Sequence, residues 1–178
     1  LYYNLGRLSN GLLFGWGDNT YGQMGYITDL YSWTQVSTNQ FHTLALRTDG
    51  ALFAWGVNNL NFQLGLNDNV SRSSPVQVSS GTTAFSTSWS QVSATASNTY
   101  AVNTSGVLYV WGNNANGQLG TNDVVSRSSP LQITAVDTFF VSPVQIGNSS
   151  WSQISAGYTH SAAIRSDNTL WTWGDNTY

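Results

Sequence analysis

Short runs of alternating apolar and polar residues, separated by turns, run through the chain. Residues 43–47 alternate, Asp49 and Gly50 interrupt them, and residues 51–55 resume the alternation. A period of two predicts strands with one buried face, and an Asp-Gly pair between two such runs favours a type I′ hairpin with positive φ at both residues. No stretch of about ten residues has apolar positions at the helical period of roughly 3.6. The pattern predicts an all-β protein with many turns.

Tryptophan recurs at a fixed spacing. Trp33, Trp89 and Trp151 each open a Trp-(Ser/Thr)-Gln-(Val/Ile)-Ser string, and a Trp-Gly pair follows each 22 residues later, at Trp55, Trp111 and Trp173. A constant spacing indicates a repeated structural unit. Trp16 begins a fourth Trp-Gly pair after the same hairpin sequence. We predict one domain, 1–178, with repeat units at about 1–32 (partial), 33–88, 89–150 and 151–178 (partial).

Two further motifs follow the Trp-Gly pairs. A polar loop ends in Gln-(Leu/Met)-Gly at residues 23–25, 63–65 and 118–120, and a Ser-Arg-Ser-Ser-Pro element occupies 71–75 and 126–130. With the Ser-Ala-Gly-Tyr-Thr-His string at 155–160, these motifs resemble the RCC1 (regulator of chromosome condensation) repeat over nearly the whole chain. The resemblance implies a β-propeller with four-stranded antiparallel blades, and seven blades in its closed forms. Phe62 departs from it, because a glycine is expected there.

The repeat count predicts about three complete blades with partial blades at both ends. Residues 173–178 match residues 16–21, where the chain continues into Gln-Met-Gly. We therefore expect a segment of a longer, seven-bladed closed propeller, with assembly of several copies into a ring as the alternative.

Composition narrows the classes of partner. The five basic residues are all arginine, the eight acidic residues are all aspartate, and the net charge is −3. Nucleic-acid binding needs a basic footprint that five scattered arginines do not supply. No apolar run approaches the roughly 20 residues that span a bilayer, so no membrane insertion is expected. The low charged fraction, 7%, favours an extracellular or virion-surface location over a cytoplasmic one.

Nothing in the sequence predicts catalysis, a metal site or a cofactor. His42 and His160 occupy the same position of different repeats, so we expect each to tie a turn within its own blade rather than to form one site. The aspartates recur at turn positions, which they favour. Cysteine is absent, which removes one nucleophile and one soft metal ligand.

The tryptophans could suggest sugar binding, but their strict phase favours packing between blades. The predicted structural core comprises Trp16, Trp33, Trp55, Trp89, Trp111, Trp151 and Trp173.

An additional segment at 134–143, in the longest connector, supplies the candidate partner-binding residues Asp137, Phe139 and Phe140. Aromatic residues exposed on a loop mark a partner surface, whereas the alternative is a small cluster tucked under the loop.

The sequence therefore predicts a non-enzymatic propeller module. It would act as a structural or protein-binding scaffold through its variable loops, with a protein partner or further copies of itself. Two alternatives stay open. The resemblance also implies a guanine-nucleotide exchange factor for a small GTPase, and exposed tryptophans would indicate a glycan-binding surface.

Overall fold

The computed structural model describes residues 3–25, 32–59, 61–79, 88–133, 150–157 and 160–174. These residues form thirteen strands and no helix. The strands are β1 (Tyr3–Arg7), β2 (Leu13–Gly17), β3 (Trp33–Thr38), β4 (His42–Arg47), β5 (Leu52–Gly56), β6 (Arg72–Gln77), β7 (Trp89–Ala94), β8 (Asn98–Asn103), β9 (Leu108–Gly112), β10 (Arg127–Gln132), β11 (Trp151–Ala156), β12 (His160–Arg165) and β13 (Leu170–Gly174).

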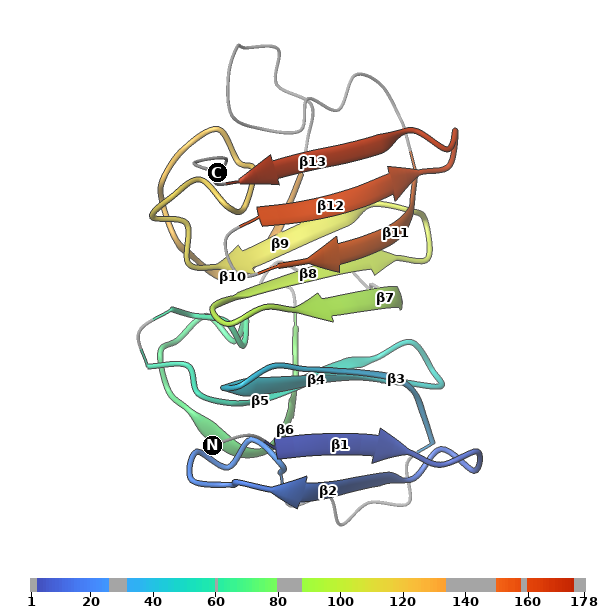
Figure 1. Cartoon of the computed structure of the whole chain (residues 1–178), viewed down its shortest axis with the longest axis vertical. Coiled ribbons are helices and arrows are strands. Elements are labelled where there is room, and N and C mark those ends of the chain that lie inside the picture. Colours follow the sequence, from blue (N-terminus) through green and yellow to red (C-terminus); the bar gives the residue numbers. More distant parts are fainter. Residues whose placement is uncertain are drawn as a thin grey trace.

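The strands make four antiparallel sheets that stack one beside the next (Figure 1). We call them blade 1 (β1-β2), blade 2 (β3-β4-β5-β6), blade 3 (β7-β8-β9-β10) and blade 4 (β11-β12-β13). The predicted all-β class with four-stranded antiparallel blades is confirmed by blades 2 and 3. Within the described residues blade 4 has three strands and blade 1 has two.

The first strand of blade 3 and that of blade 4 each lie against the first two strands of the preceding blade. The Gln35 side chain donates to the Val92 carbonyl at 3.0 Å and accepts from the Val92 amide at 3.2 Å, so it joins β3 to β7. Gln91 also donates to a carbonyl of the following blade, that of Ser152 in β11, which is two repeat positions before the counterpart of Val92. Both glutamines therefore join the first strands of neighbouring blades.

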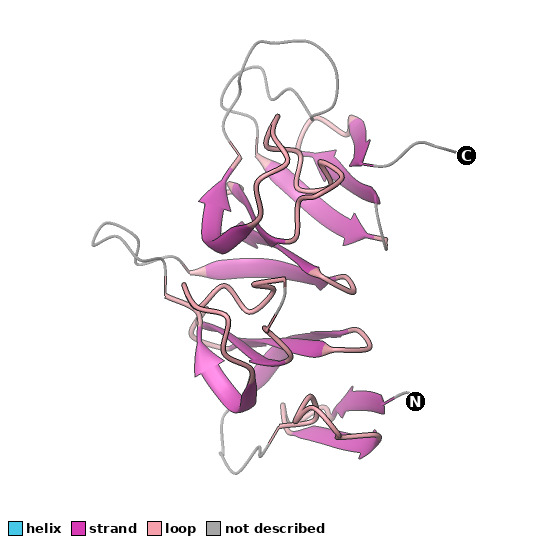
Figure 2. Cartoon of the chain, turned by 90° about the vertical axis from the view of Figure 1, so that its left-hand side faces the viewer, coloured by secondary structure: helices cyan, strands magenta, loops and turns pink. Residues whose placement is uncertain are grey.

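The fourth strands, β6 and β10, form the opposite edges of their sheets (Figure 2). Each contains a proline, Pro75 or Pro130, and each pairs irregularly with its neighbour. Proline has no amide hydrogen to offer to an added strand, so these edges resist pairing with another chain.

The hairpins differ from the expected type I′ turn. Only the second residue of each pair has positive φ, at Gly11, Gly50, Gly106 and Asn168. In blade 2 the Gly50 amide donates to the Arg47 carbonyl at 2.9 Å, and the Arg47 amide donates to Ala51 at 2.9 Å. Three residues, not two, therefore lie in the loop, and such loops use a type I turn followed by one left-handed residue. The type I′ prediction was wrong.

Six of the seven phased tryptophans are buried, at 6% exposure or less. Within a blade the rings pack in pairs: Trp33 lies edge-on to Phe53 at 5.3 Å, and Trp89 lies edge-on to Tyr109 at 5.1 Å. The paired tryptophans of a blade also meet, with 6.4 Å between the ring centres of Trp33 and Trp55 and 6.3 Å between those of Trp151 and Trp173. The tryptophans thus fill the spaces within and between sheets, where large aromatic surfaces contribute most.

Trp16 is the exception, at 55% exposure. The loop of each blade covers the tryptophan of the next: a Cβ on Gly25 would lie 2.7 Å from the Trp55 indole nitrogen, and one on Gly65 would lie 2.5 Å from that of Trp111. No such loop lies over Trp16 among the described residues. The expected core position therefore does not extend to Trp16 in this structure.

Candidate functional site

The loops after β2, β5 and β9 lie at one end of the blades, on the left of Figure 1. We call this end the loop face; its described residues are 18–25, 57–59, 61–71 and 113–126. The hairpin turns at 8–12 (between β1 and β2), 48–51 (β4 and β5), 104–107 (β8 and β9) and 166–169 (β12 and β13) lie at the opposite end, which we call the hairpin face.

Two buried asparagines hold the long loops of the loop face. Asn58 and Asn114 are fully buried. The Asn58 amide donates to the Asp68 carbonyl at 2.8 Å and accepts from the Leu64 amide at 3.0 Å. Asn114 makes the equivalent bonds, at 2.8 Å to the carbonyl of Asp123 and 2.9 Å from the amide of Leu119. These bonds satisfy backbone groups that a loop otherwise leaves without partners.

An ion pair closes each loop. Arg72 pairs with Asp68 at 2.6 Å and donates to the Val70 carbonyl at 2.6 Å. Arg127 pairs with Asp123 and donates to the Val125 carbonyl at 2.5 Å. Burial alone would raise the pKa of Asp68, but the Val70 amide and Arg72 outweigh it and leave that pKa below its ordinary value. The carboxylates therefore stay ionised and keep both loops closed at neutral pH.

Among the side chains that these loops present to solvent are three valines, and the loop of blade 1 adds a tyrosine. Val70, Val124 and Val125 are 54%, 66% and 58% exposed, and Tyr21 is 53% exposed. Val70 and Val125 occupy the same repeat position, next to the carbonyl that each arginine holds. Apolar side chains held in water by a fixed backbone are typical of interaction surfaces.

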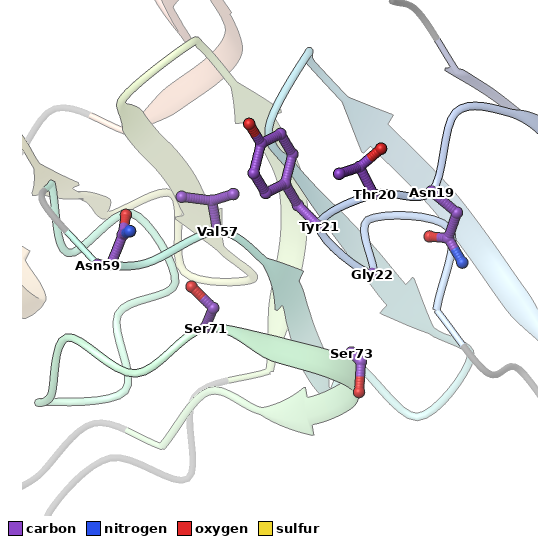
Figure 3. Close-up of a pocket in the computed structure, with 8 residues that line it drawn as sticks. All are labelled: Asn19, Thr20, Tyr21, Gly22, Val57, Asn59, Ser71 and Ser73. Atoms are coloured by element: carbon purple, nitrogen blue, oxygen red, sulfur yellow. The ribbon is translucent and has the colours of Figure 1, made fainter.

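A cavity of about 470 Å³ opens on the loop face between blades 1 and 2. Figure 3 shows its lining, with the Tyr21 ring and Val57 beside hydroxyl and amide side chains. Blade 1 and its loop contribute Asn19, Thr20, Tyr21 and Gly22, and blade 2 contributes Val57, Asn59, Ser71 and Ser73. None of these side chains carries a charge.

Beneath the loop face, hydrogen bonds run from blade to blade. His42 of blade 2 contacts the Thr99 hydroxyl of blade 3 through Nε2 at 3.1 Å, and Thr99 donates to the Gln63 carbonyl at 2.7 Å. In the preceding junction the Tyr3 hydroxyl contacts Thr43 at 2.7 Å, and Thr43 donates to the Gln23 carbonyl at 2.7 Å. The Gln-x-Gly loops at 23–25 and 63–65 are thereby attached to the blades that follow them.

His42 is uncharged in this position. Burial lowers the pKa of its imidazole to about 3. The expected turn is present, because the Asn39 amide contacts Nδ1 at 2.8 Å within blade 2. The contact with blade 3 is an additional role that the repeat spacing did not indicate. His160, at the equivalent position of blade 4, is exposed.

The candidate partner-binding residues Asp137, Phe139 and Phe140 lie outside the described residues. Within the described ranges, no group of three or more His, Cys, Asp or Glu side chains could hold a metal ion. No helix that could cross a membrane occurs in the described part of the chain.

Comparison with known proteins identifies the family. A sequence model of the regulator of chromosome condensation (RCC1) repeat matches residues 49–102 and 105–164, and a second RCC1 repeat model matches 33–63, 89–118 and 151–178. These matches cover more than half of the chain, so the chain belongs to the RCC1 repeat family.

Similar proteins differ widely in what they do. The chain is 30% identical to the human "Probable E3 ubiquitin-protein ligase HERC6" over 98% of its own length but only 17% of that protein's. It is 32% identical to the Arabidopsis thaliana "Ultraviolet-B receptor UVR8", over 71% of the chain and 31% of the receptor. The chain thus spans less than a third of either relative.

Solved structures share the fold. Human WBSCR16 matches with a TM-score of 0.78 and 22% identity, over 97% of this chain and 44% of that one. Prp20p from Saccharomyces cerevisiae, whose structure was described with its binding to Gsp1p and histones, matches with a TM-score of 0.76 and 18% identity, over 97% of this chain and 43% of that one. The chain is therefore a partial segment of an RCC1-like propeller.

Proposed function

We propose that this propeller segment is a non-catalytic protein-binding scaffold and that its loop face is the binding surface. One observation carries the proposal: loops fixed by buried asparagines and Asp–Arg pairs expose Val70, Val124 and Val125 to solvent. A fixed loop loses little conformational entropy on binding, so its apolar side chains can contribute more of their burial energy to affinity. Binding through loops on a rigid sheet scaffold is common in repeat proteins.

The non-catalytic part rests on the site chemistry. The cavity between blades 1 and 2 is lined by neutral side chains, and the buried His42 is bonded on both ring nitrogens. HERC6 is called a probable ligase, but the chain covers only 17% of it, so that activity is not carried over. The nucleotide-exchange alternative has no support of its own, because Prp20p at 18% identity shares the fold alone.

The composition-based prediction of an extracellular or virion-surface location stays a prediction. Neither the loop face nor the names of the relatives supports it. A protein partner and a further copy of this chain are both compatible with an apolar loop face, and the test below separates them.

The test compares one face with the other. We would capture partners from lysate of the source cells with the wild-type chain and with Val70→Asp/Val125→Asp. The affinity of each purified captured protein for the two chains, and the affinity of the chain for a second copy of itself, would then be measured. Leu8→Asp is the matched control, because Leu8 is a 47% exposed apolar residue on the hairpin face. Phe139→Ser/Phe140→Ser tests the connector.

We expect the loop-face variant to weaken binding at least about tenfold and Leu8→Asp to change it by less than about twofold. The proposal fails if the partner binds the loop-face variant normally and is lost from the connector variant or from Leu8→Asp. Circular dichroism and thermal unfolding would establish that each variant keeps the fold.

A further inference from the structure

The cavity between blades 1 and 2 combines one aromatic ring with neutral groups that can donate and accept hydrogen bonds. The Tyr21 ring is held edge-on against Phe41, with 6.4 Å between the ring centres, and is still 53% exposed. The Asn59 amide, the Ser73 hydroxyl and the Tyr21 hydroxyl have no hydrogen-bond partner in the described part of the chain. These groups are therefore available to a ligand.

The junction that holds the cavity lacks a contact that the next junction has. Between blades 2 and 3, the amide of Asn67 donates to the Ser128 carbonyl at 2.8 Å, and the Ser128 hydroxyl contacts the Asn67 side chain at 3.2 Å. Ser73 is the counterpart of Ser128 in the preceding blade. The first unit has only residues 26–32 between Gly25 and Trp33, and these lack the Asn-Asp and Ser-Arg-Ser-Ser-Pro elements. No counterpart of Asn67 therefore exists for Ser73.

The loop of blade 1 also has a smaller residue beside the cavity than the loop of blade 2 has at the equivalent position. Gly22 lines the cavity, whereas the equivalent position of the next loop is Phe62. A Cβ at Gly22 would lie 2.7 Å from Ser73, so the bare glycine lets the two blades approach each other beside the cavity. A volume of about 470 Å³ falls within the roughly 300–1,000 Å³ of small-molecule sites.

We infer that this cavity binds a neutral saccharide unit, with the Tyr21 ring against one face of the sugar. Hydroxyl and amide side chains both donate and accept, as sugar hydroxyls do. The C–H groups on a sugar face carry partial positive charge, which the negative face of an aromatic ring attracts.

The lining argues against other ligand classes. Phosphate, carboxylate and ammonium groups require charged partners when they are desolvated, and no lining side chain carries a charge. A peptide added as a further strand would meet Pro75 in β6, which has no amide hydrogen to offer. The inference goes beyond the proposed protein scaffold and does not depend on it.

The test is an NMR titration of the full chain with neutral saccharides: glucose, galactose, mannose, N-acetylglucosamine and their methyl glycosides. Glucuronic acid, sialic acid and a neutral tetrapeptide are the comparators. We expect at least one neutral sugar to bind saturably, with a dissociation constant of about 0.1–10 mM. Tyr21→Ala and Asn59→Ala should each weaken it about tenfold or more, while Leu8→Ala, at an exposed residue on the hairpin face, should stay within about threefold.

Two sources of the sugar can be separated in the same titration. If an oligosaccharide binds about tenfold tighter than the methyl glycoside, the ligand is a glycan chain; equal affinity indicates a free sugar. The inference is overturned if no neutral sugar saturates below about 50 mM, if both cavity variants bind normally, or if only the charged sugars or the peptide bind. Thermal unfolding of each variant distinguishes a lost site from a lost fold.

Discussion

His42 and Thr99 join two neighbouring blades across 3.1 Å. The Asn39 side-chain oxygen accepts from the amides of Phe41 and His42, so its NH₂ group must donate to His42 Nδ1, at 2.8 Å. His42 Nε2 therefore carries the proton and donates to Thr99, which donates to the Gln63 carbonyl at 2.7 Å. Each group in this series of hydrogen bonds donates to the next, from Asn39 to the Gln63 carbonyl. A protonated imidazole would carry a hydrogen on Nδ1 as well, facing the NH₂ group of Asn39.

This geometry predicts acid sensitivity. Burial lowers the pKa of His42 to about 3 in the folded chain, against an ordinary value of 6.5. Between these values the unfolded chain binds one more proton, so the free energy of unfolding decreases as pH falls below 6.5, by up to about 1 kcal/mol per pH unit. Above pH 6.5 the contribution is fully present.

Urea unfolding at a series of pH values between 7.5 and 5 would measure this slope. We expect His42→Asn, which places the residue found at position 98, to lower stability and to remove most of the slope. His160→Asn, at the exposed equivalent position, should leave the slope of the wild-type chain. An unchanged slope in His42→Asn would show that another group is responsible.

Thr99→Val tests the hydroxyl in the same relay. Valine keeps the shape but leaves the buried His42 N–H without an acceptor, so we expect a loss of about 1–3 kcal/mol in the free energy of unfolding. Thr104→Val, on an exposed hairpin turn, should stay within about 0.5 kcal/mol. If His42→Asn and Thr99→Val act through one bond, the double variant loses less than the sum of the two; strict additivity would contradict the relay.

Phe62 adopts φ of 58° where the other copies have Gly22 and Gly117 at 73° and 70°. The left-handed conformation costs a non-glycine residue roughly 1–2 kcal/mol, so we expect Phe62→Gly to raise the thermal midpoint unless ring contacts offset the gain. Gly117→Ala is the reciprocal change. A Cβ there meets nothing within 4 Å, and the loss should be about 1 kcal/mol from backbone strain alone. A destabilised Phe62→Gly would mean that packing of the ring outweighs its strain.

Gln63 and Gln118 occupy the same repeat position with different bonding. The Gln118 side chain accepts from the amide of Asn116 at 2.9 Å and donates to Asn113 at 3.2 Å. In the described part of the chain, the buried Gln63 side chain has no hydrogen-bond partner for either polar atom. Gln63→Leu should therefore cost about 1–2 kcal/mol less than Gln118→Leu in chemical unfolding. Equal costs would indicate that Gln63 is satisfied in solution.

The sequence predicts the blades well because their period is set by packing. Each opening tryptophan must meet the ring of its Trp-Gly partner, so a constant spacing and a buried position follow together, as at Trp33 and Trp55. The exposure of Trp16 could not be predicted in this way, because burial at this repeat position depends on a loop from another blade, and no such loop lies over Trp16 among the described residues. The type I′ turn was missed because loop length is set by register, which Asp49-Gly50 alone does not fix.

Less of the candidate site than of the blades could be predicted from the sequence. Val70 and Val125 lie in loops rich in polar residues, and only their equivalent positions before Ser-Arg-Ser-Ser-Pro indicated a shared role. The cavity beside Tyr21 lies in the junction where the first unit lacks the Asn-Asp and Ser-Arg-Ser-Ser-Pro elements; the short connector is visible in the sequence, but the cavity is not. The predicted residues Phe139 and Phe140 stay a separate prediction.

Hydrogen exchange of the chain with and without its captured partner tests the central claim most directly. The account predicts slowed exchange in residues 57–71 and 113–126 of the loop face, and little change in the hairpin turns at 48–51 and 104–107. Slowed exchange confined to the hairpin turns or to the connector at 134–149, with the loop face unchanged, would contradict it.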